Sequence, residues 1–184
     1  DISDLHDERL ERVLQHKLDH KTKPQGSLGR IEDIARQLGR VFGTDSPELQ
    51  LPQFVLFAGD HGIAAHGVSA FPSEVTAQMV RNFLQGGAAA SVLSRQHGLA
   101  LTVVDCGVSG DLGTHANLVD HKIAHGTADA TVAPAMTREQ CEQALANGMA
   151  VLQGLRGNAL LIGEMGIGNS SAAAGPATPP CRWQ

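Results

Sequence analysis

Hydrophobic residues near the start of the chain recur at helical spacing in two stretches. The first covers Asp7–His20 and carries a single apolar stripe: Leu10, Val13, Leu14 and Leu18. It predicts an amphipathic helix, and we expect Ser3 or Asp4 to cap it. The second covers Leu28–Phe42, with an apolar stripe of Leu28, Ile31, Ile34, Leu38 and Val41, and stops at Gly43, a residue suited to the end of a helix. No strand pattern precedes residue 51, so residues 1–50 are expected to form a helical section.

Three later stretches are short, continuous apolar runs, which are typical of buried strands. They are Phe54–Ala58, Leu99–Val104 and Ala159–Ile162. Helical patterns separate them, over Val75–Leu84, Ala88–His97 and Thr137–Leu155. The last begins with Thr137 followed three residues later by Gln140, which predicts a capping box. Strands that alternate with helices predict parallel βαβ units, so the fold class is α/β. The nucleotide-binding core is expected at residues 51–174, and residues 175–184, rich in proline and glycine, as a disordered tail.

Composition narrows the function classes. A net charge of −5 over 184 residues, with no basic run, argues against nucleic acid as a partner. No apolar run approaches the ~20 residues of a membrane span. Three scattered cysteines and a charged start of the chain favour a reducing cytoplasm. We therefore expect a cytoplasmic protein that acts on small molecules.

The stretch Asn158–Ala174 combines an apolar strand, a glycine-rich turn and the start of a helix. Glycines let the backbone approach an anion, and a helix N-terminus presents unpaired N–H groups to it. The candidate phosphate-binding residues are Gly166, Ile167, Gly168, Asn169, Ser170 and Ser171. The spacing matches neither a Walker A loop nor G-x-G-x-x-G, so an ordinary βα turn is an equal alternative on spacing alone.

Other chemistries compete at the strand ends. His61 and His66, with Asp60 and Asp105, could ligate a metal in a hydrolase, but the H-x₄-H spacing is not a standard zinc pattern, so no metal is expected. A Ser–His–Asp hydrolase lacks its G-x-S-x-G elbow. Cys106 follows a strand and could be a nucleophile, although a packed, inert cysteine is commoner.

Three segments together resemble one enzyme family: KPQGSLGR (residues 23–30), the long segment 57–93 that begins FAGDHGIAAHG, and GEMGIGNSSAAA (residues 163–174). The family is nicotinate-nucleotide–dimethylbenzimidazole phosphoribosyltransferase, which serves assembly of the lower ligand of cobalamin. The resemblance implies a three-layer αβα fold around a parallel sheet, a homodimer and no cofactor. It also implies transfer of a phosphoribosyl group from nicotinate mononucleotide to dimethylbenzimidazole, with release of nicotinate.

That chemistry requires a phosphate anchor, a slot for a flat base and a carboxylate. The glycine-rich turn would be the anchor. Ser69, Gln78 and Met79 would line the base slot, and Glu164 is the carboxylate best placed near the ribose. Asp60 and His61 are expected to be structural, with Asp60 holding a loop through backbone N–H groups.

The chain departs from the family in one respect. Family members are nearly twice as long, and the glutamate regarded as their general base lies near their C-terminus, where no position here matches. We therefore expect an incomplete sheet with an open edge, and weak or absent activity unless oligomerisation covers the exposed face. The alternative function is a non-catalytic nucleotide-binding remnant or regulatory module.

Overall fold

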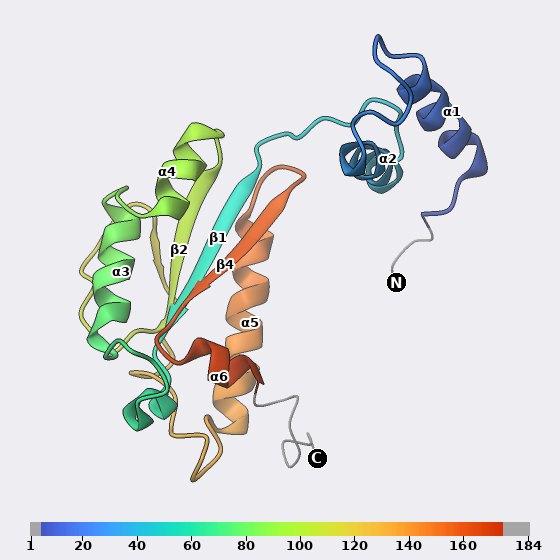
Figure 1. The fold of residues 1–184 in the computed structure, drawn as a ribbon. Coiled ribbons are helices and arrows are strands. Elements are labelled where there is room, and N and C mark those ends of the chain that lie inside the picture. The colour runs from blue at the N-terminus through green and yellow to red at the C-terminus, as the bar shows by residue number, and fades with distance from the viewer. Residues whose placement is uncertain (1–4, 175–184) are drawn as a thin grey trace. The chain divides into compact units, whose positions relative to one another are not determined.

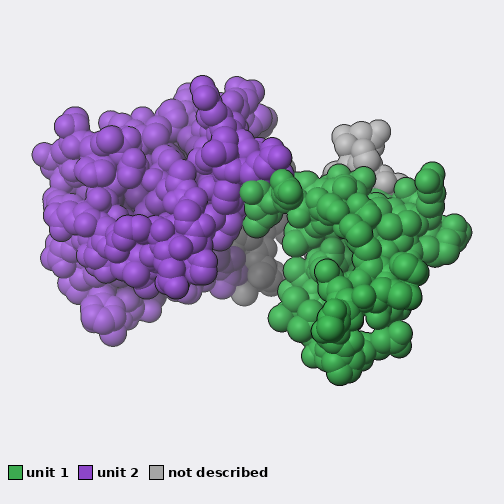
Figure 2. Space-filling model, turned by 90° about the horizontal axis from the view of Figure 1, so that it is seen from above, with its two compact units in different colours: residues 1–49 green, residues 50–184 purple. Residues whose placement is uncertain are grey.

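The structure is a computed structural model that describes residues 5–174. The chain divides between Leu49 and Gln50 into two compact units, coloured separately in Figure 2, and each is described by itself. The predicted tail, residues 175–184, lies outside the described residues, as do Ser3 and Asp4.

The first unit consists of two helices, α1 (Glu8–Asp19) and α2 (Arg30–Phe42), which confirms both helical predictions. The cap prediction for α1 was wrong. The carboxylate of Asp7 caps the helix by accepting hydrogen bonds from the backbone N–H of Arg9 at 2.9 Å and of Leu10 at 3.0 Å. Asp7 directly precedes the first helical residue, the place where a side-chain oxygen reaches those N–H groups.

The two helices pack through a close contact between Leu14 and Gly39. A Cβ on Gly39 would lie 2.5 Å from Leu14 Cδ2, so glycine admits the buried leucine. The stripe that the sequence predicts for the α2 region does not form this contact. Four of its members, Leu28, Ile31, Ile34 and Val41, are exposed, and the fifth, Leu38, is half-buried. Periodicity therefore identified the helix but not the face that packs against α1.

The basic loop between these helices is held by a mostly buried ion pair. Lys23 Nζ lies 2.7 Å from Glu32 Oε1, and the same oxygen accepts the N–H of Leu28 at 3.2 Å. The hydrogen bond from Lys23 lowers the pKa of Glu32 below its ordinary value. Lys23 therefore neutralises a carboxylate of its own unit.

The second unit contains a parallel sheet of four strands in the order β3-β2-β1-β4 among the residues described. The strands are β1 (Gln53–Gly59), β2 (Ala100–Gly107), β3 (Leu118–Asp120) and β4 (Leu160–Met165). Three of them were predicted. The sequence missed β3 because only two of its three residues, Leu118 and Val119, are apolar and polar loop surrounds them.

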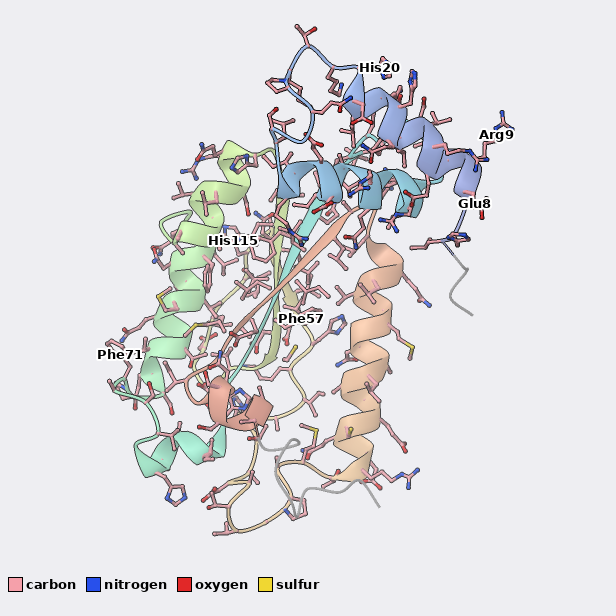
Figure 3. The ribbon with its side chains drawn as sticks, turned by 45° about the vertical axis from the view of Figure 1, so that its right-hand side comes forward. Glu8, Arg9, His20, Phe57, Phe71 and His115 are labelled. Carbon is pink, nitrogen blue, oxygen red and sulfur yellow. The ribbon has the colours of Figure 1, made fainter. Side chains whose placement is uncertain are left out.

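Helices cover both faces of this sheet (Figure 1), which confirms the α/β fold. On one face, α3 (Glu74–Leu84) and α4 (Ala89–Gln96) enclose a core that includes Leu56, Val80 and Val103. On the other face, α5 (Arg138–Gly154) packs through Val151 onto Val55 and Val104, with Phe57 against the same cluster (Figure 3). No helix in residues 5–174 is long and apolar enough to cross a membrane.

The helix α5 begins with the predicted capping box. Thr137 Oγ1 accepts the N–H of Gln140 at 3.2 Å, and Gln140 Oε1 accepts the N–H of Thr137 at 2.9 Å. This satisfies two backbone donors that a helix start leaves unpaired. The start of α5 is thereby fixed beside the carboxyl ends of the strands, where it contributes to the cavity described below.

Candidate active site

The parallel strands β1, β2 and β4 bring their carboxyl ends to one edge of the sheet, where open α/β sheets bind ligands. A cavity of about 760 Å³ lies there. Its polar wall includes Asp60 and His61 after β1 and Glu164 in β4, and Arg138 at the start of α5. The remaining lining is largely apolar, from Phe57, Ile123 and Met136 among others. A few convergent polar groups in an apolar cavity are typical of a small-molecule site.

A second cavity, of about 370 Å³, shares the Asp60 wall with the first. It is lined by side chains at i, i+4 and i+7 on α3, namely Glu74, Gln78 and Arg81, and by Ser109 and Gly110 after β2. Asp60 therefore lines both cavities, and the smaller one also contains the charged side chains of Glu74 and Arg81. The sequence singled out Gln78, and helical spacing from Gln78 could have found Arg81 as well.

Asp60 is buried and holds the neighbouring loop. Its Oδ2 accepts the backbone N–H of Ser109 at 2.8 Å, while its Oδ1 is buried without a hydrogen-bond partner among the described residues. The loop that it holds follows β2 and is fixed further by Asp105, whose Oδ1 accepts the N–H groups of Gly107 and Val108. Lys122 Nζ pairs with Asp105 Oδ2 at 3.2 Å. Sequence reasoning missed Ser109 and Lys122, because distant loops bring them here.

His61 is half-buried near the carboxylates of Asp60 and Glu164. Burial lowers its pKa from the ordinary value, and the nearby charges of Asp60 and Glu164 oppose that shift only in part. The imidazole is thus mainly neutral near pH 7. A Cβ on Gly166 would lie 3.0 Å from His61 Nε2 and 2.2 Å from the backbone oxygen of Gly59. Glycine at position 166 lets the β4 loop approach this histidine.

Glu164 is exposed, and the side-chain amide of Asn169 donates a hydrogen bond to its Oε2. The other end of that amide, Asn169 Oδ1, accepts the backbone N–H of Ser170 at 2.7 Å. Asn169 therefore links the carboxylate to the start of α6 (Asn169–Ala174). Of the residues predicted for the phosphate anchor, Asn169 thus bonds the predicted catalytic carboxylate directly, and Ser170 is connected to it only through Asn169.

The glycine-rich loop is anchored on α3. The backbone N–H of Ile167 donates to the buried hydroxyl of Thr76 at 3.1 Å, so this N–H is used within the protein. Gly168 has a positive φ of 92°, and a Cβ there would lie 3.3 Å from Ile63 Cγ2. The loop conformation therefore requires glycine at position 168. Phosphate binding by Gly166–Ser171 stays a prediction, as does the role of each residue in it.

The three residues predicted for the base slot do not share one cavity. Of the three, Gln78 lines one of the two cavities described above, and Ser69 and Met79 line neither. Met79 packs partly buried against the α3 core, and Ser69 Oγ accepts the N–H of Phe71 at 3.2 Å in the loop before α3 (Figure 3). Binding of a base by Ser69 and Met79 stays a prediction that this geometry does not support directly.

The competing chemistries find little support in the geometry. Among residues 5–174, no three His, Cys, Asp or Glu side chains lie close enough to hold a metal ion. His66 instead contacts Asp129, and Asp105 pairs with Lys122. Burial raises the pKa of Cys106 to about 11, so the thiol is almost entirely protonated at neutral pH and a poor nucleophile.

Comparison with known proteins connects this site to a family. A family model described as phosphoribosyltransferase matches residues 4–177. The chain belongs to this phosphoribosyltransferase family. The nicotinate-nucleotide–dimethylbenzimidazole phosphoribosyltransferase of Variovorax paradoxus (strain S110) is 63% identical over 173 residues, which cover 94% of this chain and 50% of the relative. The enzyme of the same name from Dechloromonas aromatica (strain RCB) is 51% identical over 171 residues, 91% of this chain and 49% of that relative.

The fold agrees with a solved member of the same phosphoribosyltransferase family. The crystal structure of nicotinate-nucleotide–dimethylbenzimidazole phosphoribosyltransferase from Thermus thermophilus matches with a TM-score of 0.80 at 41% identity. The match covers 92% of this chain and 52% of that chain. The resemblance drawn from three sequence motifs is thereby confirmed, and the chain spans about half the length of the curated relatives it matches.

Proposed function

We propose that this chain provides the nucleotide- and base-binding half of an enzyme that transfers phosphoribose from nicotinate mononucleotide to dimethylbenzimidazole. The observation that carries the proposal is the pair of cavities that Asp60 lines in common at the carboxyl edge of the sheet. A transfer between two substrates requires two adjoining sites whose occupants meet at the reacting carbon. The similarity to relatives named for this reaction supports the same assignment.

In this proposal the glycine-rich loop holds the phosphate of the nucleotide. Glu164 then lies near the ribose, where a carboxylate stabilises the positive charge that develops at the anomeric carbon. The link from Asn169 to Glu164 supports the idea that phosphate binding and carboxylate orientation are coupled. The ring nitrogen of the base attacks the anomeric carbon as the bond to nicotinate breaks, and the ring N–H proton of the base passes to a carboxylate, for which Glu164 is the candidate in this chain.

Gln78 is proposed to hydrogen-bond the incoming base. It lies in the smaller cavity, and its amide can both donate to and accept from an azole ring. The neutral imidazole of His61 and the buried carboxylate of Asp60 would keep the space between the two substrates free of bulk water. A homodimer belongs to the proposal on the family resemblance alone, and a cytoplasmic location on the scattered cysteines of the sequence alone.

The alternative is a module that binds nucleotide without catalysis. The length of the match supports this alternative, because the chain covers only 50% of the Variovorax relative. Isothermal titration of the purified chain with nicotinate mononucleotide and with dimethylbenzimidazole, followed by an assay for released nicotinate, separates the two. Binding of both with release supports the transferase. Binding without release supports the module, and binding of neither contradicts both.

A variant pair tests the assignment of the base site. Gln78→Ala is expected to weaken dimethylbenzimidazole binding about tenfold, the loss of roughly one to two hydrogen bonds, and to leave nucleotide binding unchanged. Gln85→Ala, at the exposed end of the same helix, is the matched control. If the two variants bind the base equally well, Gln78 does not contact it.

A further inference from the structure

The end of α1 carries two exposed histidines one helical turn apart. His16 and His20 lie at i and i+4, a spacing that places both side chains on the same face of a helix. Figure 3 shows His20 at the end of α1. Two histidines at this spacing are a standard way for a helix to offer two ligands to one zinc ion. His16 and His20 are called the histidine pair below.

The two imidazole rings of the pair are stacked. Their centroids lie 3.9 Å apart, and their planes differ by 19°. Two nitrogens that bind one ion at about 2.1 Å each can lie at most about 4.2 Å from each other. The stacking therefore holds the rings at a separation that one metal ion can bridge after small ring rotations. Because the pair is already assembled, little side-chain freedom is lost when an ion binds.

A hydrogen bond determines which nitrogen of His20 can bind an ion. His20 Nδ1 lies 2.8 Å from the backbone oxygen of His16. A carbonyl oxygen only accepts, so Nδ1 carries the proton of this bond. In the neutral ring the lone pair is then on Nε2, and a histidine that binds a metal commonly has its other ring nitrogen held in this way. The ring of His16 forms no hydrogen bond within residues 5–174, so it can turn toward the ion.

The surroundings of the pair favour a cation. The last carbonyl groups of a helix carry a partial negative charge, and the pair lies on the last turn of α1. The nearby positive charge of Lys17 is partly neutralised, because its Nζ lies 2.9 Å from Asp45 Oδ2. Lys21 follows His20, and its exposed side chain can extend into solvent.

We propose that His16 and His20 bind one divalent transition-metal ion of the class of Zn²⁺, Ni²⁺ and Cu²⁺, through one nitrogen of each ring. Imidazole is a preferred ligand of these ions, whereas Mg²⁺ and Ca²⁺ prefer oxygen. Two protein ligands leave the other coordination positions to water. All residues that line the two cavities belong to the second unit, and the pair belongs to the first. The proposal is therefore independent of the proposed function.

Isothermal titration of Ni²⁺ into the untagged, chelator-treated 184-residue chain tests the site. His16→Ala and His20→Ala should each raise the Kd of the tightest site at least about tenfold, because the second imidazole acts at high effective concentration once the first is bound. His97→Ala is the matched control and should leave the Kd unchanged. His97 is exposed and ends α4 as His20 ends α1, but Leu93 lies four residues before it. Circular dichroism of the three variants confirms that they are folded.

Nuclear magnetic resonance of the histidine rings gives a second measurement. Spectra that correlate ring protons with ring nitrogens should show the proton of neutral His20 on Nδ1. Addition of Zn²⁺ should shift the ring signals of His16 and His20 together. The proposal is overturned if either alanine variant of the pair binds Ni²⁺ as tightly as the unsubstituted chain, if His97→Ala weakens binding equally, or if Zn²⁺ shifts only one of the two rings.

Discussion

His66 and Asp129 connect two segments that lie 63 residues apart in the sequence, with His66 Nε2 at 2.5 Å from Asp129 Oδ2. His66 ends the short 3-10 helix η1 (Gly62–His66), and Asp129 lies in the loop whose residues Thr127 and Ala128 line the larger cavity. Hydrogen bonds from Thr131, first from its backbone N–H, and then the bond to His66 lower the pKa of Asp129 from 3.8 to about 2. The pair therefore ties the end of η1 to the loop that holds Asp129, and residues next to both, His61 and Ala128, line the larger cavity.

This pair predicts a defined dependence of stability on pH. A carboxyl whose pKa is lower in the folded chain stabilises the fold above its unfolded pKa, and the contribution is lost as pH falls from about 3.8 to about 2. Asp129→Asn should therefore lower the free energy of unfolding at pH 6. The difference from the unsubstituted chain should shrink toward pH 2. Urea unfolding at both pH values measures it, and a difference of equal size at pH 2 would contradict the assignment.

Gly166→Ala is predicted to destabilise the second unit. The added Cβ would lie 2.2 Å from the backbone oxygen of Gly59, and backbone cannot move aside as a flexible side chain can. A cost of about 1–3 kcal/mol is typical of such overpacking. Gly148→Ala in α5 is the control, since nothing lies within 4 Å of its added Cβ. The control should gain roughly 0.5–1 kcal/mol from helix propensity, and thermal unfolding of both variants reveals the opposite signs.

Cys106 is predicted to resist alkylation although it borders the larger cavity. Burial, helped by the charge of Asp105, raises its pKa from 9.0 to about 11, so its reactive thiolate fraction falls about 100-fold at pH 8. Iodoacetamide labelling followed by peptide mass spectrometry should therefore modify Cys106 about 100 times more slowly than a free peptide thiol. Labelling at the rate of the free thiol would revive the hypothesis of a cysteine nucleophile.

Much of the fold could be predicted from the sequence because its signals are local. Apolar runs identified β1, β2 and β4, and the capping box located the start of α5. Features that depend on distant contacts could not be read in this way. The strand β3 exists because a short segment pairs with Val103–Asp105, and the buried face of α2 is selected by the fit of Leu14 against Gly39.

The residues of the candidate site show the same difference between local signals and distant contacts. Asp60, His61 and Glu164 were found because each lies at or next to the end of a strand, and parallel strands end at one edge. Ser69 and Met79 were taken from the family motif, and the fold places them outside the cavity that Gln78 lines. Thr76 was missed because its hydroxyl acts on a loop 91 residues later, a pairing that no spacing rule indicates.

A pair of substitutions at Gly168 separates phosphate binding from loop conformation. The φ of 92° means that any side chain there is strained, so Gly168→Ala and Gly168→Asp should both lose about 1–3 kcal/mol of stability. Only aspartate adds a negative charge where the phosphate is proposed to bind, at the start of α6. We therefore expect the Kd for nicotinate mononucleotide to be at least about tenfold higher for Gly168→Asp than for Gly168→Ala, a difference of about 1.4 kcal/mol.

The Kd for dimethylbenzimidazole should be the same in both variants, because the base does not meet that charge. Calorimetric titration well below the unfolding temperature of each variant measures the four constants. Equal nucleotide affinities in the two variants would mean that the loop acts through its conformation alone and does not hold the phosphate.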